Sequence, residues 1–303
     1  MWFKNASIVR LPDGFEFSDN VIQNQFLEFH LKPPGPFDKD SSGWVSPFGL
    51  DSDVCFHRIG NYLLIALGIE QKVIPDAAIK HQVSTQVRSR EAAGEILSSD
   101  DKLLIKEKII ADYLPTALTK LKVINAFIDL RLNILVIDTP SFNMVSAFVN
   151  LLRETFKGHT EYPMRFVPFK SGNTVQPMTQ WVHVGDTGIN RLEIANNVVL
   201  GKPEGTGGVL RGKNIDVESD EINGHIDKGY LVNELGLLFG GVVSFTFSKD
   251  YVLKSISFDK SITDSILSNG YESENDRVDA IFDVVTQYLG ELIEQLLINV
   301  SFQ

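Results

Sequence analysis

The chain has 303 residues, a net charge of −11 and a single cysteine, Cys55. This length allows a substantial core, in one large domain or in roughly two to three subdomains. One cysteine excludes an internal disulfide, the N-terminus shows no signal peptide, and no apolar stretch is long enough to span a bilayer. We therefore expect a soluble, cytoplasmic protein that does not act at a membrane.

Strand and helix signals alternate in the first part of the chain. Ala6–Leu11 predicts a strand, and Ser18 can cap a helix over Asp19–His30. Lys32–Ser42 is rich in proline and polar residues, which indicates a loop. Tyr62–Ile69 is a dense apolar run of strand length.

Two helices are predicted next, one over Pro75–Glu91 and one that begins at a cap on Ser99 or Asp100 and ends near Tyr113. They form a helical hairpin that is ended or bent by Leu114–Pro115. The apolar stripe of the second helix is expected at Leu103, Leu104, Ile109 and Ile110. The basic residues of the hairpin are Lys80, Arg88, Arg90, Lys102, Lys106 and Lys108.

The remaining elements contain neighbouring strand pairs separated by helices. Strands are predicted over residues 123–130, 132–139, 164–169, 209–215, 231–238, 242–248 and 251–258. Helices are predicted over residues 142–156, 174–184, 217–228 and 277–300, the last with a broad apolar face suited to a core or a dimer contact. This order favours an α+β fold with antiparallel sheets flanked by helices.

Positive charge is concentrated in the middle of the chain. Residues 1–79 carry a net charge of −4, residues 80–213 carry +4, and residues 214–303 carry −11. Phosphate binding depends on local basic density, so the acidic total does not exclude nucleic acid. An acidic outer body with a basic inner face would discourage DNA from binding elsewhere.

Four basic residues have positions that suit phosphate contacts. Arg211 and Lys213 alternate on a predicted strand, so their side chains share one face. Lys120 and Lys122 follow the exit of the helical hairpin. Such residues can bind phosphates without reading bases, which gives affinity without sequence preference.

Enzyme and metal chemistry find little support in the sequence. The six histidines lack the paired spacing of a metal site, and no phosphate-binding loop or serine nucleophile motif occurs. Asp129 and Asp138 lie near the ends of two adjacent predicted strands, where metal-dependent nucleases place acids, but both also suit turn and helix caps. We predict no catalytic residue, no metal and no cofactor, with a nuclease kept as an alternative.

A series of short motifs runs from end to end of the chain. They are Trp2–Asn5, Arg10–Leu11, Gly43–Gly49, Lys72–Pro75, Ile79–Lys80, Leu114–Leu118, Phe127–Asp129, Ile137–Ser141, Leu151–Arg153, Thr179–Val182 and Gly207–Lys213. Their order and spacing resemble the RdgC family of recombination-associated DNA-binding proteins. The resemblance implies a ring-shaped homodimer that binds duplex DNA without sequence preference and restrains RecA, and it implies no catalysis.

The resemblance also implies an architecture. Residues 1–74 and 123–170 would form a central α+β region, residues 75–122 a helical tip that acts as a gate, and residues 171–303 a base with the C-terminal helix. Lys80, Arg211 and Lys213 match motif positions of the family, whose basic residues surround the inner wall of the ring. Leu118 stands where the family usually has an aromatic residue at the contact between the two tips. In the turn of the helical hairpin this chain has Gly94–Leu97, where the family tends to carry more basic residues.

The leading hypothesis is therefore a dimeric ring around duplex DNA that modulates RecA-dependent recombination in the cytoplasm, at the nucleoid. Its proposed DNA contacts are Lys80, Arg88, Lys120, Lys122, Arg211 and Lys213, with Leu118 as the dimer gate. The alternatives are the nuclease and a protein-binding adaptor that keeps the fold with little DNA affinity.

Overall fold

The computed structural model describes residues 1–12, 15, 17–49, 52–159, 166–168, 174–203 and 207–300. In these ranges twelve strands form one sheet in the order β2-β4-β5-β6-β1-β12-β11-β10-β8-β9, with β3 beside β4 and β7 beside β1. The strand pairings are antiparallel, which confirms the α+β class with antiparallel strands. The strands join into a single sheet, where several had been expected.

The central half of the sheet is covered by helices on both faces. Its strands are β1 (Ala6–Arg10), β2 (Asp40–Val45), β3 (Phe56–Ile59), β4 (Tyr62–Lys72), β5 (Thr119–Asp129), β6 (Ile134–Ile137) and β7 (Val167–Pro168). Helices α1 (Asp19–Glu28) and α4 (Phe142–Thr155) pack on one face around Phe26, Trp44 and Phe148. Alternate residues of β5 enter different cores, with Ile128 in this one and Phe127 in the core on the opposite face.

The base half contains the other five strands and most of the second core. Its strands are β8 (Leu192–Gly201), β9 (Leu210–Lys213), β10 (Leu231–Phe239), β11 (Val243–Ser248) and β12 (Val252–Phe258). Its helices are α5 (Val175–Val184), α6 (Asp220–Ile226), α7 (Lys260–Ser268) and α8 (Glu274–Val300). Helix α8 buries Phe282, Leu289, Leu292 and Leu296 in a core that also includes residues of the central half, such as Leu64 and Phe127.

The two halves of the sheet meet along a short seam between β1 and β12. The seam has two register pairs, Ala6 with Leu253 and Ser7 with Val252, whereas β4 and β5 are paired over eleven. One further backbone bond, from the Ile256 N–H to the Lys4 carbonyl at 2.8 Å, extends it. The sheet is therefore continuous but narrow at this point.

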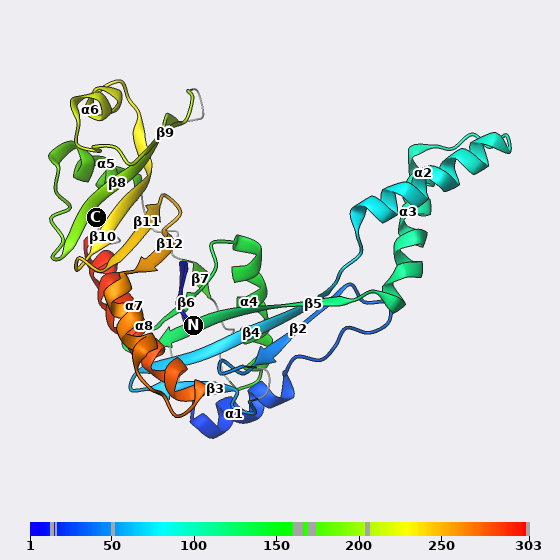
Figure 1. The fold of residues 1–303 in the computed structure, drawn as a ribbon, viewed down its shortest axis with the longest axis horizontal. Helices are drawn as coiled ribbons and strands as arrows, with labels where there is room; N and C mark the ends of the chain where they lie inside the picture. Colours follow the sequence, from blue (N-terminus) through cyan, green and yellow to red (C-terminus); the bar gives the residue numbers. More distant parts are fainter. Residues whose placement is uncertain are drawn as a thin grey trace.

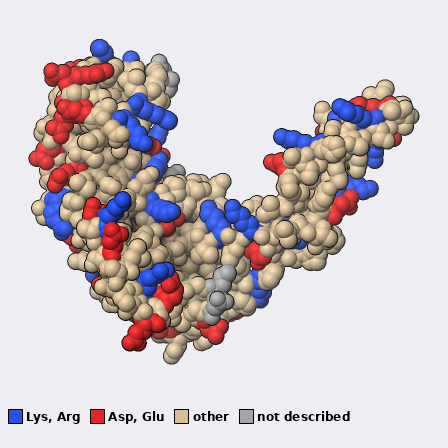
Figure 2. Space-filling view, viewed as in Figure 1, with Lys and Arg blue, Asp and Glu red and all other residues tan. Residues whose placement is uncertain are grey.

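A helical arm extends from the far end of β4 and β5 (Figure 1). It consists of α2 (Asp76–Ala92), α3 (Ser99–Tyr113) and the 3-10 turn η1 (Leu114–Thr116). A small core of Ile79, Ile105 and Ile109 holds α2 and α3 together. The arm and the base half rise on opposite sides of the central half (Figure 1), and an open hollow lies between them (Figure 2).

The arm corrects two expectations about α3. Its N-cap is Ser98, whose hydroxyl accepts from the Asp101 N–H while the Asp101 carboxylate accepts from the Ser98 N–H, so the cap precedes the expected residues. Leu103 and Leu104 are 53% and 62% exposed, and Ile105 is buried in their place. The expected stripe is confirmed at Ile109 and Ile110 and wrong at Leu103 and Leu104, because three apolar residues in a row leave the helical phase ambiguous there.

Other differences concern strands and one helix. Residues 40–42 of the expected loop belong to β2, which pairs with β4. The sequence did not predict the strands β3 and β8 or the helix α7. It did predict the helix α1 and its cap at Ser18. Of the expected strand over residues 164–169, the structure describes only 166–168, where β7 lies, and the other residues of that strand are outside the described ranges.

Candidate nucleic-acid interface

Charge is distributed unevenly around the hollow between the base half and the arm. Figure 2 shows basic side chains on the inner side of the base half and along the floor of the hollow, and acidic side chains along the outer side of the base half. The six basic residues proposed from the sequence lie on three elements that border this hollow, which are β9, β5 and α2 (Figure 1).

Strand β9 presents Arg211 and Lys213 on one exposed face. The strand pairs with β8, with Arg211 opposite Val199 and Lys213 opposite Asn197. Gly212 lies between them, and a Cβ there would come within 2.1 Å of the Ile215 side chain. The glycine thus lets Ile215 pack beneath the strand, and the two cations are left on the solvent side.

Strand β5 presents Lys120 and Lys122 near the root of the arm. Both are exposed, and they are in phase with Ile124 and Ile128 of the same strand. The same face of β5 therefore passes from apolar core at one end to two lysines at the other. Their separation of two residues corresponds to about 7 Å along the strand.

Helix α2 carries Lys80 and Arg88 on its exposed side. They are eight residues apart, which is about 12 Å along a helix axis. Ile79 is the buried residue of this helix, so the neighbouring Lys80 lies at the edge of the contact with α3. The structure does not bring this pair into contact with the lysines of β5 or with the pair on β9.

The six basic side chains share one property beyond exposure. None of them forms an ion pair or side-chain hydrogen bond within the described part of the chain. By contrast, Arg191 binds Glu291 with both nitrogen–oxygen distances near 2.9 Å, and Arg131 binds Asp129 at 2.8 Å. A cation without a carboxylate partner breaks no ion pair when it binds a phosphate, and the bond that it forms is charge-assisted.

Lys202 is a further basic residue near β9 that was not predicted from the sequence as a DNA contact. It directly follows β8, and its ammonium lies 5.1 Å from the centre of the Tyr230 ring. The register of β8 and β9 places it at the Arg211 end of β9. It was missed because β8 itself was not predicted, so no pattern connected residue 202 with the strand that follows.

Leu118 lies at the junction of the arm and β5. Its carbonyl accepts a hydrogen bond of 2.8 Å from the Val73 N–H, and its side chain is 83% exposed. It is not part of the small core formed by Ile79, Ile105 and Ile109. The side chain is therefore available for contact with another molecule.

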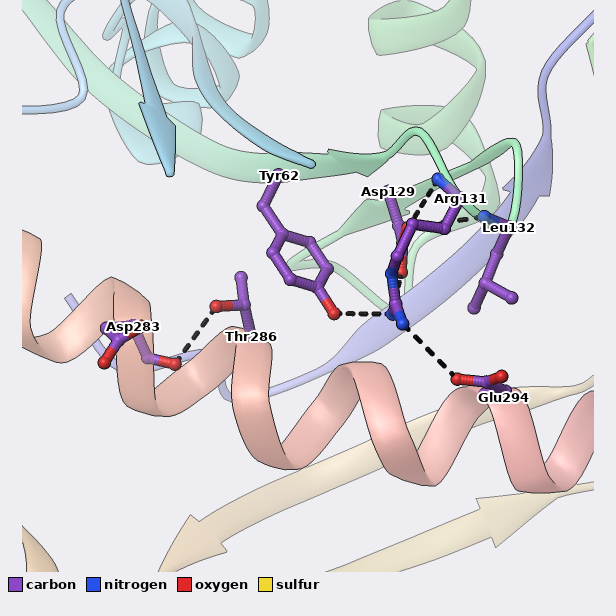
Figure 3. Close-up of polar contacts among 7 residues, drawn as sticks. All are labelled: Tyr62, Asp129, Arg131, Leu132, Asp283, Thr286 and Glu294. Carbon is purple, nitrogen blue, oxygen red and sulfur yellow. Dashed lines mark hydrogen bonds and ion pairs between the residues drawn. The ribbon is translucent and has the colours of Figure 1, made fainter. Parts of the chain in front are cut away.

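Asp129 and Asp138 serve the structure of the central half. Asp129 is fully buried and accepts from the backbone N–H of Arg131 and Leu132 at 2.9 and 3.3 Å, and from the Arg131 guanidinium (Figure 3). Asp138 accepts from the N–H groups of Lys4 and Asn5 at 3.0 and 2.8 Å. Burial raises the pKa of the Asp138 carboxyl, and these two hydrogen bonds oppose the rise.

The same two acids are too far apart to share a metal pair. The Asp138 N–H donates to the Asn125 carbonyl, so Asp138 lies beside Asn125 on β5. Asn125 and Asp129 are four residues apart on this strand, which is about 13 Å. Two-metal sites hold their ions about 3.5–4 Å apart. Among the described residues, no three His, Cys, Asp or Glu side chains gather as a metal site.

Comparison with known proteins places the chain in a family. The fold is of the α+β class, with one antiparallel sheet, a projecting arm and a partly basic hollow. In the described part of the chain, no helix is long and apolar enough to cross a membrane. The sequence model described as "Putative exonuclease, RdgC" matches residues 1–300. The chain belongs to the RdgC family.

Curated relatives match the chain over nearly its whole length. The chain is 29% identical to the recombination-associated protein RdgC of Psychromonas ingrahamii over 303 residues, which are 98% of this chain and 97% of the relative. It is 28% identical to the protein of the same name from Sodalis glossinidius, over 98% of this chain and 96% of the relative. The Aeromonas hydrophila protein of that name is also 28% identical, with the same coverage. These relatives are named for recombination and not for an enzymatic activity.

Proposed function

We propose that this protein binds duplex DNA without sequence preference, as a homodimer whose two hollows together enclose the duplex. The observation that carries the proposal is the set of six exposed, unpaired cations on β9, β5 and α2, which border one hollow. Their side chains can contact phosphates at several points, and phosphate contacts carry no sequence information. Membership of the RdgC family supports a role at recombining DNA.

The arrangement of charge explains how an acidic protein can bind DNA. The chain has a net charge of −11, but many of its acidic side chains lie on the outer side of the base half, away from the hollow, and others lie on the central half and the arm (Figure 2). The Debye length is about 8 Å at physiological salt, so a phosphate in the hollow interacts mainly with the cations beside it. The outer acidic side chains keep the duplex from binding outside the hollow.

Enclosure would come from a second copy of the chain. Leu118 is 83% exposed at the root of the arm, and we propose that it closes the ring against the partner as a gate. A ring that encloses duplex DNA in the nucleoid would occupy sites that RecA needs, so antagonism of RecA follows from occupancy. It requires no direct contact between the two proteins.

The test is the salt dependence of duplex binding. Arg211→Ala together with Lys213→Ala removes two phosphate contacts from each protomer and four from the dimer, so the log–log slope of affinity against salt should fall by about four units for every sequence tested. Arg58→Ala with Lys157→Ala is the matched control, because it removes the same charge from cations that already pair with Asp19 and Glu154.

The outcomes distinguish the alternatives. An unchanged slope in the Arg211 and Lys213 variant, or an equal loss in the control variant, would contradict phosphate contacts on β9. A stable dimer that binds no duplex at low salt would favour a protein-binding adaptor. Light scattering that shows a monomer at micromolar concentration would remove the ring.

A further inference from the structure

Helix α8 connects the two halves of the sheet across the narrow seam between β1 and β12. Its Phe282 ring lies 6.3 Å from that of Phe127 in the central half, and its Tyr288 ring lies 6.3 Å from that of Phe258 in the base half. Because the seam has only two register pairs, the packing of α8 contributes much of the contact between the halves.

Ion pairs from α8 also reach both halves. Glu291 binds Arg191, which directly precedes β8 in the base half. Glu294, less than one turn further along, lies 3.7 Å from Arg131 in the turn between β5 and β6 of the central half. Adjacent positions on one helix are thus held by opposite halves of the molecule.

The contact with the central half is fixed closely. Arg131 is held by the buried Asp129, and its guanidinium also donates to the Tyr62 hydroxyl at 2.7 Å (Figure 3). This hydroxyl faces Gly290, where a Cβ would come within 2.5 Å of it. Ordinary van der Waals contact begins near 3.4 Å, so any larger residue at 290 forces α8 and Tyr62 apart by roughly 1 Å.

We propose that Gly290 and Arg131 are positioning residues for the basic surface of the hollow. They determine how closely α8 lies against the end of the β4–β5 pair that contains Tyr62 and Asp129, opposite the arm. They therefore determine the angle between the central and base halves. That angle fixes the distance from β9 to the arm, because β9 belongs to the base half and the arm extends from the central half. The inference rests on the proposed DNA binding and names what sets its geometry.

The experiment measures the width of the hollow and duplex affinity in the same variants. Spin labels at Glu107→Cys on α3 and Glu221→Cys on α6, in a Cys55→Ser background, report the distance across the hollow. Labelled chains are diluted with unlabelled protein so that the distance is measured within one chain.

Gly290→Ala should displace or broaden the distance distribution and lower duplex affinity several-fold, with far-ultraviolet circular dichroism unchanged. Adding Tyr62→Phe removes the hydroxyl that meets the new Cβ, and the next ring atom, Cζ, is 3.3 Å away. The double variant should therefore regain both the parent distance and most of the affinity. A generally weakened fold would show no such rescue.

Glu294→Gln provides a second variant that keeps the size of the side chain and removes its charge pair with Arg131. It should broaden the distance distribution without the clash. If folded Gly290→Ala keeps the parent distance, or if the distance changes while affinity does not, the inference is overturned. If Gly290→Ala does not fold, an unchanged distance in Glu294→Gln overturns it. Lack of duplex binding by the parent protein would instead refute the proposed function.

Discussion

Removing the carboxylate of Asp129 should destabilise the protein more than removing a surface acid. Asp129 is fully buried at the end of β5, where it accepts hydrogen bonds from two backbone N–H groups of the β5–β6 turn and from the Arg131 guanidinium. In Asp129→Ala the turn loses its acceptor, and Arg131 loses the partner that orients it towards Tyr62 and Glu294.

The size of the effect follows from these contacts. Breaking a buried ion pair from one side costs about 3–5 kcal/mol. The Arg131 side chain is 41% exposed and keeps two other partners, so we expect the lower end, about 3 kcal/mol. Asp129→Asn keeps an acceptor for the backbone but turns an amide N–H₂ or a weaker oxygen towards the guanidinium, and we expect about 2 kcal/mol.

Urea unfolding provides the assay. The midpoint urea concentrations of the variants and the parent are compared, provided that the free energy of unfolding depends on urea with the same slope in each protein. Glu154→Ala is the control, because Glu154 is 55% exposed and its ion-pair partner in the described part of the chain is Lys157. Its loss should change the free energy of unfolding by about 0–1 kcal/mol. Equal midpoints for Asp129→Ala and Glu154→Ala would refute the structural role assigned to Asp129.

Three further predictions concern the gate, the arm and pH. Leu118→Asp should leave a folded dimer that loses retention on closed circular DNA more than on short linear duplex. Leu118→Phe should retain circular DNA at least as well as the parent. If Leu118→Asp binds circular and linear DNA as the parent does, Leu118 is not a gate residue. Ile105→Ala should cost about 2–4 kcal/mol, read as earlier proteolysis of the arm, while the 62% exposed Leu104→Ala should change little. Burial raises the pKa of Asp138 above its ordinary 3.8, so its ionisation weakens the fold as pH rises through the folded-state pKa. Relative to the parent, the urea midpoint of Asp138→Asn should therefore increase as pH rises above 3.8, and parallel pH profiles of the two proteins would count against this account.

The sequence predicted elements whose signals are local. Ser18 caps α1 as expected because its hydroxyl acts within three residues, on the Val21 N–H. The strand β8 was missed because it contains Asn196 and Asn197 and alternates poorly, and it is a strand only because β10 and β9 pair with it on both sides. Tertiary pairing of this kind overrides weak intrinsic preference.

In the candidate interface, too, some features follow from local sequence and others arise only from tertiary contacts. The common face of Arg211 and Lys213 follows from the two-residue period of a strand, and both are exposed on β9. Which cations remain free could not be predicted, because Arg191 finds Glu291 across 100 residues and Arg131 finds Glu294 on α8. The clash that reserves position 290 for glycine also arises only when Tyr62 is brought against α8.

The position of β1 in the sheet has a consequence for the order in which the chain folds during synthesis. One edge of β1 pairs with β6, which is complete by residue 137. The other edge pairs with β7 at Val9 and Arg10, and at Ala6 and Ser7 it pairs with β12, which begins at residue 252. Until β12 is made, Ala6 and Ser7 have an unpaired edge, the kind of surface through which nascent chains aggregate. Helix α8 follows β12 in the chain and packs on both halves at once, so its synthesis joins the base half to a central half whose strands were made earlier.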